Sequence, residues 1–342
     1  MKHWYFYIGI LFTLCSCSQV HYISMDIRKP APVTFDENVR KILIVDNSFR
    51  QMYPDSILAK DGLLVVSNTL IDTIRPIILN SVATFINEER LFDTVEVYPY
   101  YPKPIYTYYE NDTIYELPLT RDEIQDICYR TESDALISID YIGLEYVYQP
   151  YTGLDNGALK SHMGIIARAY AYNGDTLGPP AGLVHPFSFT VHPNEEYKVA
   201  VREIDTLTKK NAIWMADNLV NHFIPKWERT ERLFYTYDLG EEEKIKKLID
   251  SEDWSGAIYI WKERYENQKA NNKKKITYAL NIAMAYEFSD DMENALKWTN
   301  TADGLLKNND KSIFATNIKK YKEMLDKRIK EAPTLKHQLR IE

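Results

Sequence analysis

The run KILIVD at residues 41–46 decides the fold of the first half of this chain. Its four apolar residues are consecutive, and they stand between Lys41 and Asp46, with polar Asn47 and Ser48 following. A short continuous apolar run that ends in polar residues is typical of a central strand, covered on both faces. The run therefore predicts a strand in the interior of a sheet.

The segments after this run alternate between helical and strand patterns. A helix is expected from about Thr73, and the alternating residues 92–98 predict a second strand. Thr120 and Glu123 form a capping-box pattern that opens a second helix, and residues 134–141 predict a third strand. The order strand, helix, strand, helix, strand predicts an α/β layer with right-handed crossovers.

The next segments extend this layer into a mixed sheet. Residues 165–172 alternate strictly and run into an Asn-Gly pair at 173–174, which is a strong hairpin signal. Residues 187–191 predict another strand, residues 195–223 a long helix, and residues 227–237 a strand that returns to the sheet. We therefore predict an α+β or α/β domain, a mixed sheet with covering helices, over residues 38–238.

Beyond Gly240 the pattern is all-helical, and it repeats. Residues 253–258 (DWSGAI) match residues 291–296 (DMENAL). Small residues at helix contacts and an aromatic on the first helix resemble the tetratricopeptide pattern, here Ala283, Tyr286, Ala295 and Ala302. We expect a tetratricopeptide-like helical domain over residues 239–335 and a tail over 336–342. A generic helical bundle with alanine contacts is the alternative.

The N-terminus resembles the lipobox of bacterial lipoproteins. Lys2 precedes an apolar stretch too short to span a bilayer, and the small residue Ser16 stands directly before Cys17. The likeness implies a signal peptide over 1–16, lipidation at Cys17, and a tether over 17–37 with one edge strand near residues 20–23. An ordinary cleaved signal and an uncleaved anchor are the alternatives.

The residues after Cys17 predict where such a lipoprotein resides. Ser18 and Gln19 stand where an Asp often retains such proteins at the inner membrane, so they favour the outer membrane. Residues 18–22 lack the acidic cluster that accompanies surface export in some Gram-negative groups, which favours a periplasm-facing protein. Membrane attachment through the N-terminal lipid is therefore expected.

Composition excludes several classes of function. Hydrophobic residues make up 45% of the chain, as in ordinary globular proteins, and the net charge of −8 argues against nucleic-acid binding. With Cys15 in the signal and Cys17 lipidated, Cys128 is the one remaining thiol, which excludes a disulfide framework. Phosphate-loop, nucleophile-elbow and zinc motifs are absent, and His185 and His192 are spaced to opposite faces of a regular strand. We expect no cofactor and no metal.

The whole arrangement is similar to a family of uncharacterised lipoproteins typical of Bacteroidota. The likeness rests on the lipobox, the strand at residues 41–45, the segment at 134–140, and the helix end at 224–227 followed by residues 232–235. That family has no assigned activity, so it implies architecture only. The first half also looks, more loosely, like periplasmic domains of curli-secretion lipoproteins and of lipoprotein activators of wall synthesis, which bind partners.

The function that we expect is non-enzymatic binding or scaffolding, with an envelope protein or peptide held by the helical repeats. Candidate contact residues are the aromatics Trp254, Trp261, Tyr286 and Trp298. One alternative is glycan binding by the aromatic segment 98–109, with Tyr100, Tyr101, Tyr106 and Tyr108 as candidates. The other is a hydrolase in the α/β domain, where the carboxylates near strand ends are Asp46, Asp134 and Asp140.

Overall fold

The computed structural model describes residues 19–48, 68–98, 118–148, 159–173, 176–177, 181–191, 197–236, 239–267, 269–307 and 312–341. The chain forms two compact units. One, the α/β unit, contains residues 30–226 and 334–342, and the other, the helical unit, contains residues 1–29 and 227–333. None of the described helices is long and apolar enough to cross a membrane.

The α/β unit is built on a six-stranded mixed sheet, which confirms the predicted class. Strands β2 (Lys41–Asp46), β3 (Thr94–Tyr98) and β4 (Ala135–Tyr148) are parallel, in the order β3-β2-β4. Strands β5 (Leu159–Asn173), β6 (Thr176–Leu177) and β7 (Ala181–Val191) continue it antiparallel, with β7 and β6 both paired to β5. The expected hairpin after residue 173 is present, because Asn173 pairs with Thr176.

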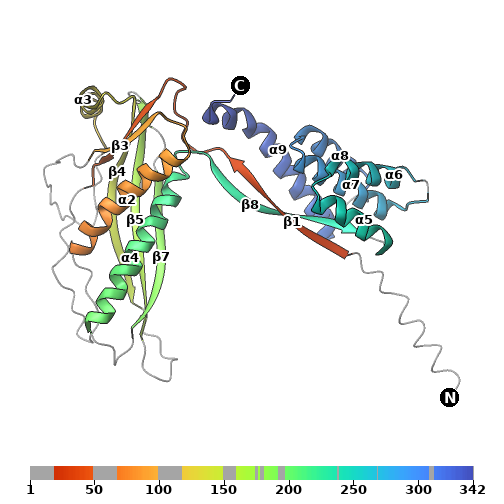
Figure 1. Ribbon diagram of the computed structural model, residues 1–342, viewed down its shortest axis with the longest axis horizontal. Helices are drawn as coiled ribbons and strands as arrows, with labels where there is room; N and C mark the ends of the chain where they lie inside the picture. Colours follow the sequence, from red (N-terminus) through yellow and green to blue (C-terminus); the bar gives the residue numbers. More distant parts are fainter. Residues whose placement is uncertain are drawn as a thin grey trace, which may run out of the picture. The chain divides into compact units, whose positions relative to one another are not determined.

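Helices cover both faces of the parallel strands, as the apolar run in β2 predicted. Helices α2 (Asn68–Glu88) and α4 (Tyr197–Val220) lie together on one face (Figure 1), where α2 packs on β2 and α4 packs on β5 and β7. Ile42 and Ile44 of β2 belong to the core on this face. Helix α3 (Arg121–Thr131) covers the other face, above Leu43 and Val45. The predicted capping box opens α3 with both of its hydrogen bonds present.

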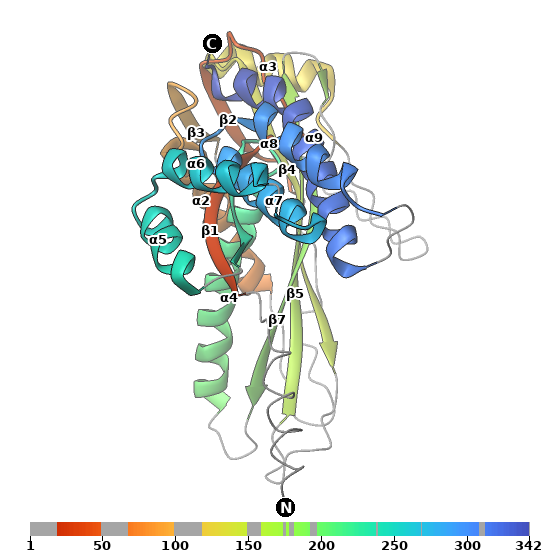
Figure 2. The same ribbon diagram turned by 90° about the vertical axis from the view of Figure 1, so that its right-hand side faces the viewer.

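The helical unit contains α5 (Leu239–Asp250), α6 (Trp254–Glu266), α7 (Asn272–Phe288), α8 (Met292–Gly304) and the larger part of α9 (Ile313–Leu339), as Figure 2 shows. Asp253 and Asp291, which match in the repeat, cap α6 and α8 by accepting a backbone N–H. The preceding residues, Glu252 and Asp290, share a left-handed backbone, with φ of 56° and 58°. The small residues expected at helix contacts, Ala283, Ala295 and Ala302, are fully buried.

Two expectations near the unit boundary are corrected. Residues 227–237 do form a strand, β8 (Lys226–Thr236), but it pairs with β1 (Gln19–Lys29) in a separate two-stranded sheet rather than returning to the large one. The edge strand expected near residues 20–23 is therefore longer, and it occupies much of the expected tether. Ion pairs such as Lys29–Glu228, at 2.6 Å, join the two strands.

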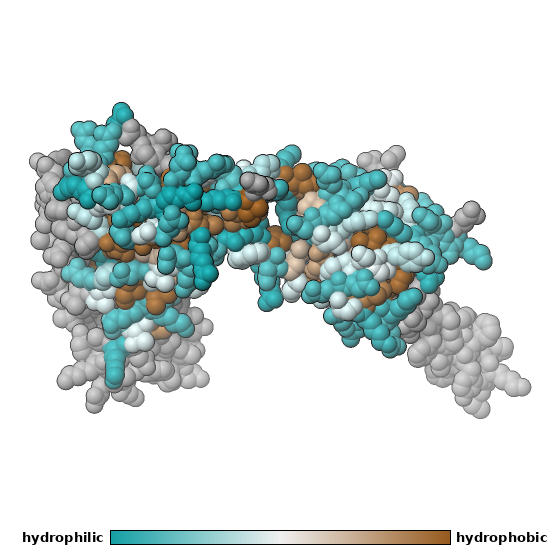
Figure 3. All heavy atoms as spheres, turned by 45° about the horizontal axis from the view of Figure 1, so that its top comes forward, coloured by the Kyte–Doolittle hydropathy of each residue, from teal (hydrophilic) through white to brown (hydrophobic). Residues whose placement is uncertain are grey.

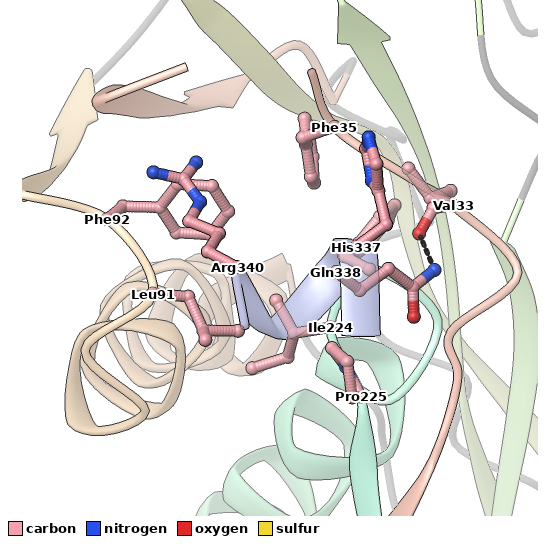
Figure 4. A pocket seen from close by; sticks show the side chains of 10 residues that line it. Val33, Phe35, Leu91, Phe92, Ile224, Pro225, His337, Gln338 and Arg340 are labelled. Atoms are coloured by element: carbon pink, nitrogen blue, oxygen red, sulfur yellow. Dashed lines mark hydrogen bonds between the residues drawn. The ribbon is translucent and has the colours of Figure 1, made fainter. Parts of the chain in front are cut away.

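The last residues of the chain, expected to form a tail, are also ordered. They continue α9 as far as Leu339, and the amide of Gln338 holds residues 31–34. Its Oε1 accepts from the Ala31 N–H at 2.9 Å, and its Nε2 donates to the carbonyls of Ala31 and Val33, both at 2.9 Å. The side chain of Arg340 lies over the ring of Phe92, beside a small hollow lined mainly by apolar residues (Figure 4).

Candidate functional site

A side chain of the repeat helices binds the main chain of β8. Tyr235 donates its backbone N–H to Asn281 Oδ1 at 3.1 Å, and Asn281 Nδ2 donates to the Tyr235 carbonyl at 2.7 Å. Asn281 belongs to α7 and is fully buried, which strengthens the two hydrogen bonds relative to bonds on the surface. The two bonds satisfy one residue of an extended strand much as a neighbouring strand would.

Alternate side chains of β8 point into the helices, as the two-residue period of a strand requires. Phe234 is fully buried, with its ring stacked 5.4 Å from Trp261 and 6.0 Å from Trp254. Phe288 completes this aromatic cluster, since its ring centroid lies 4.4 Å from that of Trp254. The repeat helices thus form a pocket for one side chain of β8.

The second inward side chain of β8, Arg232, enters a buried polar network. Its Nε and Nη2 each donate to a carboxylate oxygen of Glu287 at 2.6 Å, a bidentate pair. Tyr321 Oη of α9 donates to the same carboxylate at 2.8 Å, and Arg328 of α9 pairs with it as well. The network ties β8, α7 and α9 together at a point where Glu287 is fully buried.

The charges in this network fix its protonation states. Burial by itself would lower the pKa of Arg232, but the hydrogen bonds and charge of Glu287 raise it above its ordinary value. Burial and the Glu287 carboxylate raise the pKa of Tyr321 well above its ordinary range. Tyr321 therefore keeps its proton and remains a hydrogen-bond donor at neutral pH.

The four aromatics proposed from the sequence as contact residues fall into two groups. Trp254 and Trp261 belong to the cluster around Phe234, and Trp261 is fully buried, so it packs the interior. Tyr286 and Trp298 lie elsewhere and are only partly buried. Lys262 joins these two: its Nζ donates to Tyr286 Oη at 2.7 Å and lies 5.8 Å from the centroid of the Trp298 ring.

We call the partly buried group around Lys262 the aromatic–lysine patch, and it is formed by Lys262, Tyr265, Lys275, Tyr286 and Trp298. The Tyr265 ring meets Trp298 edge-to-face at 5.2 Å, and Lys275 Nζ lies 5.8 Å from the Tyr265 centroid. The patch draws on α6, α7 and α8, so the repeat itself brings these side chains together. On the face drawn in Figure 3, polar residues cover most of this unit and apolar areas between them are small.

The remaining candidates from the sequence divide between described and undescribed residues. Cys17, Tyr100, Tyr101, Tyr106 and Tyr108 lie outside the described residues, as does His192. Within the described ranges, no group of three His, Cys, Asp or Glu side chains could hold a metal ion.

The three strand-end carboxylates do not act alike. Asp134 fixes the backbone at the start of β2, where its Oδ2 accepts from the N–H groups of Arg40 and Lys41, both at 2.8 Å. This is the capping role expected of an Asp in a turn. Asp46 and Asp140 are instead buried together at the other end of β2.

Sequence reasoning missed Asn281, Arg232 and Glu287, the three residues that hold β8 most directly. Charged and amide side chains in amphipathic helices usually face solvent, and the sequence offers no signal of the distant strand that buries these. The alternation of residues 231–235 gives a partial signal, because Arg232 shares a face with Phe234.

Comparison with known proteins places the chain among families without an assigned activity. No curated protein matches it in sequence. The crystal structure of the rare lipoprotein B from Shewanella oneidensis aligns with 52% of this chain and 90% of its own, at 9% identity. The TM-score of 0.27 is too low for that likeness to support an argument. Residues 243–327 match a domain of unknown function, DUF6340. Residues 39–235, more than half of the chain, match another, and the chain accordingly belongs to the family described as a domain of unknown function, DUF8603.

Proposed function

We propose that this protein is a lipid-anchored envelope protein that binds a protein or peptide partner through its helical unit and catalyses no reaction. In this proposal, Cys17 carries the lipid, and the chain is held at the outer membrane, facing the periplasm. The binding domain is a tetratricopeptide-like array, α5 to α9, together with the β1–β8 pair that it holds.

The aromatic–lysine patch is the observation that carries this proposal. Its Tyr and Trp rings are partly exposed. Such side chains supply much of the binding energy at protein interfaces, because they bury a large area with few rotatable bonds. Lys262 and Lys275 add positive charge beside those rings. The chemistry that fits the patch is an extended segment with acidic and apolar side chains.

The binding of β8 favours one face of the helical unit as the site for the partner. Asn281 and Glu287 of α7 already contact Tyr235 and Arg232 of the same chain. A partner that used those groups would have to displace β8 and expose Phe234. Among the described residues, no strand occupies the patch as β8 occupies the groups on α7, so the proposal assigns the partner to it.

The start of β1 supports a proposal about which unit lies at the membrane. β1 begins at Gln19, two residues after the lipidated Cys17 of the proposal. Two residues span at most about 7 Å, so the acyl chains hold the helical unit directly at the bilayer surface. Partners that reach the patch would therefore be membrane proteins or periplasmic segments close to the membrane.

A crosslinking pull-down from native envelopes tests this function with three full-length lipidated chains. These are the unaltered protein, Trp298→Ala and Tyr259→Ala, where Tyr259 of α6 is 71% exposed and serves as the matched control. We expect one stoichiometric partner with the unaltered and Tyr259→Ala chains, and its loss with Trp298→Ala. Equal capture by all three chains would contradict the assignment to the patch.

A further inference from the structure

The topology of the α/β unit creates a switch point at the carboxyl ends of β2 and β4. The chain runs from β2 through α2 on one face to β3, and then through α3 on the opposite face to β4. Because β2 lies between β3 and β4, the first connection runs from β2 to one neighbour, and the second runs back from β3 past β2 to the other neighbour. Open α/β sheets bind ligands at this point, outside the carboxyl ends of the strands.

Buried polar side chains gather at this switch point. Asp46 ends β2, where it pairs with Ile139 of β4, and Asn47 and Ser48 follow it. Ser48 donates through Oγ to Asp46 Oδ1 at 2.5 Å and through its backbone N–H at 3.1 Å. All three residues are buried.

Strand β4 contributes the other half of the cluster. Asp140 accepts hydrogen bonds from Ser138 Oγ, at 2.5 Å, and from the Asn47 side-chain amide. The strand register shifts between Ile139 and Tyr141, which places a β-bulge at Asp140. Bulges of this kind re-aim side chains and are frequent beside functional sites.

Arg75 of α2 places its guanidinium at the cluster. One edge of this group, formed by Nε and Nη2, has no close hydrogen-bond acceptor among the described residues. Only 7% of the residue is exposed. Its Nε lies 3.9 Å from Asp46 Oδ2, beyond hydrogen-bond distance. Within the part of the chain that the structure describes, Nε and Nη2 have no hydrogen-bond acceptor. These two nitrogens form the edge with which arginine binds a pair of oxygens.

We propose that the switch-point cluster binds a small ligand through a carboxylate group, which the Nε and Nη2 edge of Arg75 holds in a bidentate pair. Burying a donor without an acceptor costs free energy. A ligand carboxylate that accepts from both Nε and Nη2 would remove this cost, and its binding would be stabilised accordingly. Ser48, Asn47 and Ser138 hydrogen-bond the Asp46 and Asp140 carboxylates, whereas Nε and Nη2 of Arg75 have no acceptor among the described residues.

The neighbouring carboxylates decide between anion types. A phosphate with about two charges at neutral pH would be repelled more strongly by Asp46 and Asp140 than a singly charged carboxylate. The group recognised is therefore a carboxylate, whose source is either the C-terminus of a peptide or an acidic sugar.

Calorimetric titration of the full chain with small probes tests the proposal. The probes are N-acetylglycine for a peptide end, glucuronate for an acidic sugar, inorganic phosphate, and N-acetylglycinamide as the neutral match. We expect a carboxylate probe to bind at least about tenfold more tightly than its amide and than phosphate. The tighter of the two carboxylates identifies the source.

Two variants link binding to the cluster. Arg75→Gln should weaken carboxylate binding at least about tenfold, whereas Arg130→Gln, on the exposed surface of α3, should leave it unchanged. Asp46→Asn should strengthen binding, because it removes a like charge beside the bound carboxylate. A gain in affinity cannot arise from misfolding, so this variant keeps the test decisive if Arg75→Gln fails to fold.

The proposal is overturned if the neutral amide or phosphate binds as tightly as the carboxylates, or if Arg75→Gln folds and binds normally. It is equally overturned if Asp46→Asn folds and shows no gain. In those cases Arg75 serves only to neutralise Asp46 within the fold.

Discussion

Asn281 binds the backbone of Tyr235 with both ends of its side-chain amide, although 46 residues separate them in the chain. The pair holds the backbone of β8 on α7, and the buried contacts of Phe234 and Arg232 fix the register of the strand. It joins the short sheet of β1 and β8 to the repeat helices.

Asn281→Ala should destabilise the protein by about 1–3 kcal/mol, because it removes two hydrogen bonds between a buried side chain and the main chain of Tyr235. Urea unfolding measures the loss, and amide hydrogen exchange should show faster exchange confined to β8 and its neighbours. Asn300→Ala, on the exposed side of α8, is the control and should shift stability little. Equal effects of the two changes would contradict the role given to Asn281.

Glu287→Gln should be more damaging, by about 3–5 kcal/mol, because Arg232 and Arg328 would then share a buried site without a carboxylate. The double variant with Arg232→Met should recover part of that loss, since it removes one of the stranded charges. Thermal unfolding of the single and double variants gives the coupling. A double variant less stable than Glu287→Gln alone would show that the charges are not coupled in this way.

The N-cap of α8 should make stability depend on pH in a defined direction. Hydrogen bonds from the side chain and backbone of Asn294 lower the pKa of Asp291 below its ordinary 3.8. A lowered pKa stabilises the fold above the unfolded value, and that contribution is lost as the pH falls through the folded value. Asp291→Ala should therefore cost about 1 kcal/mol at pH 7 and less at pH 2. A difference between the two chains that grows on acidification would contradict this account.

The two kinds of tryptophan should separate stability from binding. Trp261→Ala removes a fully buried ring stacked on Phe234 and should cost about 3–5 kcal/mol. Trp298→Ala removes a partly exposed ring and should change stability far less while abolishing partner capture. Both statements are tested by measuring unfolding curves for the same variants that are used in the pull-down. If Trp298→Ala lost much of its stability, its failure to capture the partner could not be attributed to binding.

The sequence was sufficient to predict elements whose causes are local. The apolar run at 41–46, the capping box at Thr120 and the Asn-Gly pair each depend on neighbours within a few residues, and each is confirmed. The class of the first unit, a mixed sheet with covering helices, followed from their order.

What the sequence could not predict is pairing between distant segments. The strand at 227–237 was foreseen, but its partner, β1, lies about two hundred positions earlier, and alternation alone does not say which sheet a strand joins. For the same reason Trp261 and Trp298 looked equivalent, although only the first is covered by Phe234 of β8. The cluster of Arg75, Asp46 and Asp140 could not be predicted either, because the topology of the sheet brings these distant residues together.

Site-specific photocrosslinking tests the central claim, that the aromatic–lysine patch binds the partner, most directly. A photoreactive phenylalanine replaces Tyr286 in one full-length lipidated chain and Tyr259 in another, and both are irradiated in native envelopes. We predict one discrete adduct from position 286, absent from position 259 and lost when Lys262 and Lys275 are both changed to Glu. The same adducts from both positions, or an adduct at 286 that survives this charge reversal, would contradict the claim.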